Sequence, residues 1–189
     1  MNKFLTNLKR RASLSEIAIN EVTSRVEVID LKKGELFLRE QQICQHLYFL
    51  DSGVVRIYHT DKGKEISTWF YNEDQFFTTW YSFVNKVPGF EYLEAVTSCK
   101  VFALSYENLT QLCTLHPEFE AVRRNILEEQ LAFIDYFSKG YMFLSAKERY
   151  QHLLAYFPSI ELHVKLMHIA SFLGISLETL SRLRSGSHT

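Results

Sequence analysis

Cysteine is scarce in this sequence, and the three that are present, Cys44, Cys99 and Cys113, lie far apart. They form no Cys-x-x-Cys pair and no cluster with the spacing of metal ligands, so neither a zinc site nor a disulfide framework is indicated. We therefore expect buried, reduced thiols in a cytoplasmic protein that carries no metal and no other cofactor.

Long apolar runs are also missing, because no window reaches the roughly 18 uninterrupted apolar residues that a membrane span needs. The first residues, MNKFLTNLKRRASLSEIAI, interrupt their apolar positions with charges, unlike a signal peptide. The net charge is only −1. The chain is therefore not basic throughout, although a local basic patch would be enough to bind a nucleic acid.

Catalytic motifs are lacking as well. The predicted strands hold no His-x-His pair, and the chain has no Gly-x-Ser-x-Gly sequence and no phosphate-binding loop. Glu91 and Glu94 are separated by an odd number of positions, which would put them on opposite faces of a strand. We predict that the protein is not an enzyme.

The patterns that are present change along the chain. After a helical stretch over residues 1 to about 25, short β-type runs alternate with turns that carry Gly, Asp or Asn, which predicts an antiparallel sandwich or barrel. The expected strands are Val26–Leu31, Leu36–Arg39, Leu47–Leu50, Val54–Tyr58, Ile66–Tyr71, Tyr92–Val96 and Val101–Leu104.

From Tyr106 the apolar period becomes helical, and helices are predicted over Tyr106–Leu115, from Pro117 to about Lys139, and over Ala146–Tyr156. The fold class is α+β, with a β domain over 1–115, a connecting helix over 116–140 and a helical unit over 141–189. One stripe of the long helix is apolar, and it predicts either a dimer seam or a face packed on the β domain. That stripe consists of Phe119, Val122, Ile126, Phe133 and Phe137.

The segment from His163 to Arg184 has the pattern of a helix-turn-helix. Gly174 ends a first apolar helix, and Ser176 caps a second one. The exposed side of the second helix is rich in polar groups, so it could enter the major groove of DNA, whereas an ordinary helical hairpin is the alternative. The candidate DNA-binding residues are Ser176, Leu177, Glu178, Thr179, Ser181, Arg182 and Arg184.

In this order, the motifs resemble the CRP/FNR superfamily of bacterial transcription factors. The resemblance is carried by Leu31–Ser67, Glu94–Ser105 and Ile169–Arg184, and Thr68-Trp69-Phe70 is similar to Bacteroidetes-type members. It implies an N-terminal antiparallel jelly roll like a cyclic-nucleotide-binding domain, a long dimerisation helix and a C-terminal helix-turn-helix domain. The implied function is a cytoplasmic transcription regulator that binds two half-sites of double-stranded DNA as a homodimer.

The resemblance also implies roles in the second helix. Glu178 would accept from a cytosine amino group, Arg182 would bond guanine, and Thr179 would contact phosphate. Leu177 stands where the family has an arginine, so the operator should differ, and this side chain could touch a thymine methyl instead. The sequence ends five residues after Arg184, and we therefore expect no β-hairpin wing of the kind that many members have.

The family's nucleotide pocket requires a glutamate for the ribose and an arginine for the cyclic phosphate. At the matching places this chain has Phe77-Thr78-Thr79 and Gly89-Phe90. A buried phosphate without a cationic partner is costly, so we expect no binding of cyclic AMP in the usual way. The candidate effector pocket is Phe77, Thr78, Thr79, Gly89, Phe90 and Tyr92, whose aromatic side chains either stack on an apolar or planar ligand or simply fill the roll.

Other sensor chemistries of the family match poorly. The cysteines lack the spacing of the iron–sulfur members, and His46 and His59 are typical of surface or hydrogen-bonded histidines rather than haem ligands. The alternative function is a degenerate family member that acts as a protein-interaction or small-ligand-sensing module without sequence-specific DNA binding.

Overall fold

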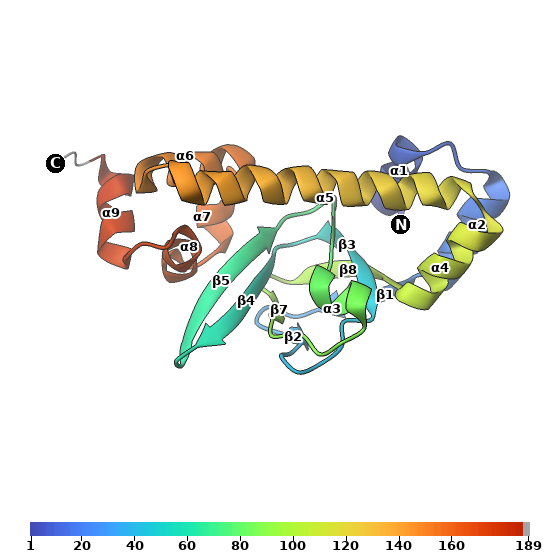
Figure 1. Ribbon diagram of the computed structural model, residues 1–189, viewed down its shortest axis with the longest axis horizontal. Helices are drawn as coiled ribbons and strands as arrows, with labels where there is room; N and C mark the ends of the chain where they lie inside the picture. The colour runs from blue at the N-terminus through green and yellow to red at the C-terminus, as the bar shows by residue number, and fades with distance from the viewer. Residues whose placement is uncertain (187–189) are drawn as a thin grey trace.

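The computed structural model describes residues 1–186 (Figure 1), and the expected absence of a wing falls on residues 187–189, outside the described part. Two short helices, α1 (Asn2–Arg11) and α2 (Glu16–Arg25), precede the strands. The Oγ of Ser15 accepts from the backbone N–H of Ala18 and so begins α2. The helical stretch predicted over residues 1 to about 25 is therefore two helices.

Two four-stranded antiparallel sheets follow, in the orders β1-β8-β3-β6 and β2-β7-β4-β5. They face each other as a jelly roll, here called the roll, and do not close into a barrel. The predicted α+β class and the antiparallel jelly roll are thus confirmed. The strands are β1 (Glu27–Leu31), β2 (Leu36–Leu38), β3 (His46–Ser52), β4 (Val55–Asp61), β5 (Lys64–Tyr71), β6 (Gln75–Phe77), β7 (Tyr92–Ala95) and β8 (Cys99–Ser105).

The outer face of the first sheet is covered by α1. The ring of Phe4 packs on Phe49 of β3 at 5.6 Å and on Phe102 of β8 at 5.4 Å between centroids. Both strands are therefore buried on two faces, which is why they read as continuous apolar runs in the sequence and show no alternation.

The predicted hairpin joins β4 to β5. Asp61 pairs with Lys64 across a two-residue turn, Lys62-Gly63, in which both residues have positive φ, 49° and 78°. This combination is the type I′ geometry that suits the twist of a hairpin, and Gly adopts it without a steric cost.

The helices after β6 place the remaining parts of the molecule. A short helix, α3 (Trp80–Asn85), lies over the roll, and α4 (Tyr106–Leu115) leads into α5 (Glu118–Phe143), which runs along the length of the molecule in Figure 1. At its far end are α6 (Ala146–Tyr156), α7 (Ile160–His163), α8 (Leu166–Leu173) and α9 (Leu177–Ser185).

The predicted seam on the long helix faces the chain's own core. Phe119, Val122 and Ile126 are at most 3% exposed and belong to the core of the roll. Phe133 and Phe137 instead contact the Trp69 ring, with centroids 4.4 and 4.7 Å away. The seam prediction is therefore wrong for Phe119, Val122 and Ile126, because an apolar stripe does not say whether it meets a partner or its own fold. For Phe133 and Phe137, which are half-buried, it stays a prediction.

The helical unit at the C-terminal end shares its core with the roll. Phe70 of β5 packs on Phe172 of α8 with ring centroids 5.6 Å apart. The backbone N–H of Ser67 donates to Ser171 Oγ at 3.0 Å, and Ser171 Oγ donates to the carbonyl of Glu65 at 3.1 Å. The helix-turn-helix is therefore docked along β5.

Candidate nucleic-acid interface and effector cavity

Helices α8 and α9 form a helix-turn-helix. Gly174 takes the left-handed conformation at φ 65° and ends α8. Ser176 Oγ accepts from the Thr179 N–H at 3.2 Å and so begins α9. Leu180, which is fully buried, fixes α9 against the unit's core.

The outward side of α9 is uncovered by the rest of the described chain. It lies at the end of the molecule in Figure 1, away from the roll. Six of the seven candidate DNA-binding residues are exposed, and the seventh, Thr179, is half-buried. The sequence pattern therefore placed these side chains together on one accessible face.

The polar groups of this face differ in how far they are already engaged. Arg184 Nε pairs with Glu161 Oε1 at 2.7 Å, and the Tyr150 hydroxyl donates to the same oxygen at 2.8 Å. Arg182 makes only a long hydrogen bond, 3.5 Å, to Thr179 Oγ1. Of the two arginines of α9, Arg182 therefore has the guanidinium that is more available for contact with another molecule.

Hydrogen bonding to Ser176 lowers the pKa of the Glu178 carboxyl. Glu178 is therefore a carboxylate at neutral pH and can only accept hydrogen bonds, as a contact to a cytosine amino group requires.

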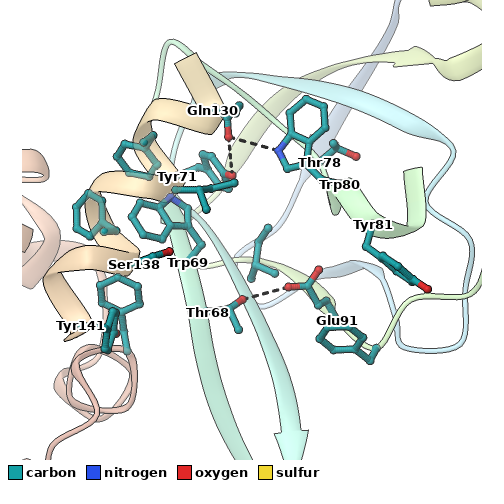
Figure 2. A pocket seen from close by; sticks show the side chains of 16 residues that line it. Thr68, Trp69, Tyr71, Thr78, Trp80, Tyr81, Glu91, Gln130, Ser138 and Tyr141 are labelled. Carbon is teal, nitrogen blue, oxygen red and sulfur yellow. Dashed lines mark hydrogen bonds between the residues drawn. The ribbon is translucent and has the colours of Figure 1, made fainter. Parts of the chain in front are cut away.

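A second site is a cavity of about 380 Å³ between the roll, α3, α5 and α8 (Figure 2). Its wall is mostly aromatic, with a few polar groups, which is typical of small-molecule sites. The residues that line it are Ile57, Thr68, Trp69, Tyr71, Thr78, Trp80, Tyr81, Phe90, Glu91, Gln130, Phe133, Ile134, Phe137, Ser138, Tyr141 and Phe172.

Gln130 of α5 ties three elements together at one end of this cavity. Its Oε1 accepts from the Tyr71 hydroxyl at 3.3 Å and from Trp80 Nε1 at 3.4 Å, as the dashed lines in Figure 2 show. At the other end, Thr68 Oγ1 donates to Glu91 Oε1 at 3.3 Å. Burial raises the pKa of the Glu91 carboxyl.

Of the predicted pocket residues, only Thr78 and Phe90 line this cavity. Phe77 is fully buried and stacks on Tyr48 in the core. Tyr92 stacks on Tyr58, with centroids 4.9 Å apart. Thr79 and Gly89 also lie outside the lining of the cavity.

Sequence reasoning missed the rest of the lining. The lining comes from six separate stretches of sequence, and no local pattern joins them. The available signal was the aromatic density around Thr68-Trp69-Phe70, which pointed to the right strand but not to its partners on α5 and α8.

Arg56 of β4 links the roll to the helix-turn-helix. Its Nη2 lies 2.6 Å from Glu65 Oε2 and its Nε donates to Glu94 Oε2 at 2.8 Å. Its Nη1 donates to Nδ1 of His168 on α8. The Arg56 side chain is only 2% exposed, so the docking of α8 depends on a nearly buried charge that is neutralised by two carboxylates.

This contact predicts a dependence of stability on pH. Burial and the neighbouring Arg56 charge lower the pKa of His168, against the smaller opposing effects of Glu65 and Glu94; Lys165 also lowers it. The folded chain therefore keeps the imidazole neutral, whereas the unfolded chain protonates it near pH 6.5. The free energy of unfolding should then fall as the pH drops below about 6.5, where the unfolded chain takes up the proton, and level off below the lowered pKa of the folded chain.

Urea unfolding across that pH range tests the prediction. Burial lowers the pKa of His46 too, so the wild-type slope contains both histidines, and the comparison with His168→Gln isolates one of them. In the variant, the free energy of unfolding should change less steeply with pH than in the wild type. An unchanged slope in His168→Gln would contradict the assigned role.

The three cysteines are buried and unpaired. Burial raises the pKa of the Cys113 thiol to about 11, which makes its thiolate scarce at neutral pH. Within residues 1–186, no group of three or more His, Cys, Asp or Glu side chains is arranged to hold a metal ion. None of the helices in that part of the chain combines the length and the apolar character needed to cross a membrane.

Comparison with known proteins shows which domain family and which fold the chain resembles. Residues 28–116 match the cyclic nucleotide-binding domain family. Among solved structures, the chain is similar to the c-di-GMP-responsive global regulator CLP of Xanthomonas campestris, with 20% identity, 91% of each chain covered and a TM-score of 0.69. No curated protein matches the sequence.

Two further structures have the same fold. A protein of Eubacterium rectale, described as a regulator of the crp/fnr family, has 18% identity over 92% of this chain and 83% of its own, with a TM-score of 0.70. The catabolite activator protein of Thermus thermophilus has 20% identity over 95% and 85%, with a TM-score of 0.58. The resemblance to CRP/FNR proteins is thus confirmed at the level of the fold: residues 28–116 match the cyclic nucleotide-binding domain family, and more than nine-tenths of the chain superimposes on these regulator structures. The narrower likeness to Bacteroidetes-type members stays a prediction.

Proposed function

We propose that the protein is a DNA-binding transcription regulator that acts as a homodimer and is not an enzyme. The single observation that carries the proposal is the exposed outward face of α9, which presents Glu178 and Arg182 from a capped helix at the end of the molecule. Helices of this kind read base edges in the major groove. The division into a sensor domain over 1–115, a dimerisation helix over 116–140 and a DNA-binding domain over 141–189 belongs to the same proposal, as does a cytoplasmic location.

A second copy of the chain is the proposed partner of α5. Its exposed apolar side chains include Leu127, Leu131, Ile134 and Tyr141, at intervals of four, three and seven residues. This is the spacing of a coiled-coil seam, and it lies beside the face that packs on the roll. A two-fold dimer would present two copies of α9 to two half-sites.

The variant Leu131→Glu should abolish the dimer. Leu131 is 69% exposed, and a carboxylate at the centre of the seam would lose its water and face its own copy. Light scattering should give a dimer mass for the wild type and a monomer mass for the variant. Ala132→Glu is the matched control, because it places the same charge one residue along, on a side of α5 that the seam does not use. A monomeric wild type at high protein concentration would count against the seam.

Selection of bound sequences from a random DNA pool tests the function itself. The expected result is a sequence with two-fold symmetry and half-sites about one helical turn apart. Recovery of no enriched sequence, with or without cell extract, would instead favour a protein-interaction or ligand-sensing module without sequence-specific DNA binding.

The proposal includes an effector cavity that does not bind cyclic AMP in the usual way. The cavity occupies the space between the roll and α5. Of the residues that match the family's nucleotide pocket, only Thr78 and Phe90 line it, and neither supplies a carboxylate for a ribose or a cation for a cyclic phosphate.

A further inference from the structure

The charge of the cavity is opposite to that expected for a site that binds an anion. Among the 16 described residues that line it, Glu91 is the single charged side chain, and none is Lys, Arg or His. A phosphate placed there would lose its water, gain no cationic partner and face a carboxylate. The cavity therefore disfavours anionic ligands as a class.

The wall of the cavity is suited to a flat or apolar body. Trp69 meets Phe133 at an interplanar angle of 90° and Phe137 at 80°, so the rings present both faces and edges. The faces of such rings carry negative electrostatic potential and attract cations within about 6 Å. Tyr81 and Phe90 are large and more than half exposed, and they flank Glu91 at the rim of the cavity.

Two polar groups of the lining have unused hydrogen-bonding capacity. Glu91 accepts from Thr68, and a carboxylate can accept several hydrogen bonds. The indole N–H of Trp69 is buried and has no partner within residues 1–186. A buried donor without an acceptor is costly, and a ligand that supplies one would remove that cost.

From this arrangement we propose that the cavity binds a small organic cation with a planar or apolar body. Its ammonium pairs with Glu91, and its body stacks on the aromatic wall around Trp69. This ligand class deepens the proposed function. It rests on the proposed function only because it treats this cavity as the effector site.

The same cavity reaches the DNA-binding unit. Phe172 belongs to α8 and lines the cavity, and its ring centroid is 5.2 Å from that of Trp69. A ligand that stacks on Trp69 therefore touches both the roll and the first helix of the helix-turn-helix. Such a ligand would lie beside the Phe70–Phe172 contact that docks α8 on β5.

Calorimetric titration of the full chain with three probes tests the charge preference. Tryptamine and indole-3-acetate share an indole ring and differ in the sign of their charge, and cyclic AMP is the anion that the family's own pocket accepts. A pH of about 8 favours the carboxylate form of Glu91, whose pKa burial raises, and keeps the amine ionised. Tryptamine should bind at least about tenfold more tightly than indole-3-acetate, a difference of about 1.4 kcal/mol, and cyclic AMP should not bind at micromolar concentration.

Glu91→Gln should reduce the preference between the two indoles to within about twofold. The control is Glu107→Gln, which removes the same charge at an exposed position on α4 and should leave the preference unchanged. Equal or tighter binding of the acid by the wild type overturns the proposal, as does micromolar binding of cyclic AMP or no binding of tryptamine at millimolar concentration. The wild-type comparison stands even if a variant fails to fold. The titrations contain no DNA, so their failure leaves the DNA-binding proposal untouched. If tryptamine binds but the random pool yields no selected DNA sequence, only the DNA-binding proposal is refuted.

Discussion

Replacement of Arg56 by alanine should destabilise the protein by about 3 kcal/mol, the lower end of the range for breaking a buried ion pair. Arg56 satisfies Glu65, Glu94 and His168 at once, and its guanidinium carbon lies 4.0 Å from the centroid of the Tyr58 ring. Its loss leaves Glu94 with an unpaired charge that is mostly shielded from water. Glu65 is 44% exposed and can turn to solvent, which keeps the expected loss near the lower end.

Urea unfolding measures this loss as a lower midpoint, provided that the slope of the transition is unchanged. Arg10→Ala is the matched control, because Arg10 pairs with Asp74 at 3.8 Å on the surface, and exposed pairs contribute about 0.5 kcal/mol. Hydrogen exchange should also accelerate in α8 of Arg56→Ala, since the helix loses its contact with β4. Equal effects of the two variants would show that the Arg56 network contributes no more than a surface pair.

The sequence does not reveal this role of Arg56. In the run Val54-Val55-Arg56-Ile57-Tyr58, the arginine reads as the polar side of a hairpin strand. Its partners lie 9, 38 and 112 residues away, and no pattern in the chain connects those positions. A buried polar group of this kind is visible only once the sheets and helices are packed together.

Elements with strong local signals were predicted well. Helices α4 and α6 have the predicted bounds, Tyr106–Leu115 and Ala146–Tyr156, because Ser105 and Ser145 cap them and the apolar period is clear. Strand β6 and helix α3 were missed. They lie in the aromatic stretch after Gln75, where dense apolar residues show neither the strand nor the helix period.

The candidate sites also differ in how far local sequence determines them. The candidate DNA-binding face of α9 depends on one helix, its cap and its preceding glycine, so the sequence specifies it locally. The cavity and the seam depend on which face of α5 meets the roll. The apolar stripe that begins at Phe119 packs on the roll, whereas the proposed seam begins at Leu127. In the sequence, Leu127 is one of many apolar positions on the long helix and has nothing to distinguish it.

Arg182→Ala should weaken binding to the selected operator by roughly 30-fold or more. A bidentate contact from arginine to guanine is worth about 1–3 kcal/mol, and a dimer would lose it in both half-sites. The Arg182 side chain is exposed and makes one long hydrogen bond within the described chain, to Thr179 Oγ1, so its truncation disturbs little else. Fluorescence anisotropy at a fixed salt concentration measures the loss, because the phosphate contribution to affinity changes steeply with salt.

Two further variants separate base reading from charge. Lys100→Ala removes a positive charge from β8, on the roll, and should change affinity by less than about threefold. The loss of affinity in Arg184→Ala should lie between those of Arg182→Ala and Lys100→Ala, since Arg184 is already paired with Glu161 and would act mainly by holding α9 against α7.

Selection of bound DNA with Arg182→Ala should also lose its preference at one base pair in each half-site while keeping the spacing between the half-sites. If Arg182→Ala keeps the full preference, another residue of α9 reads that base, and the assignment of Arg182 falls while the helix-turn-helix geometry stands.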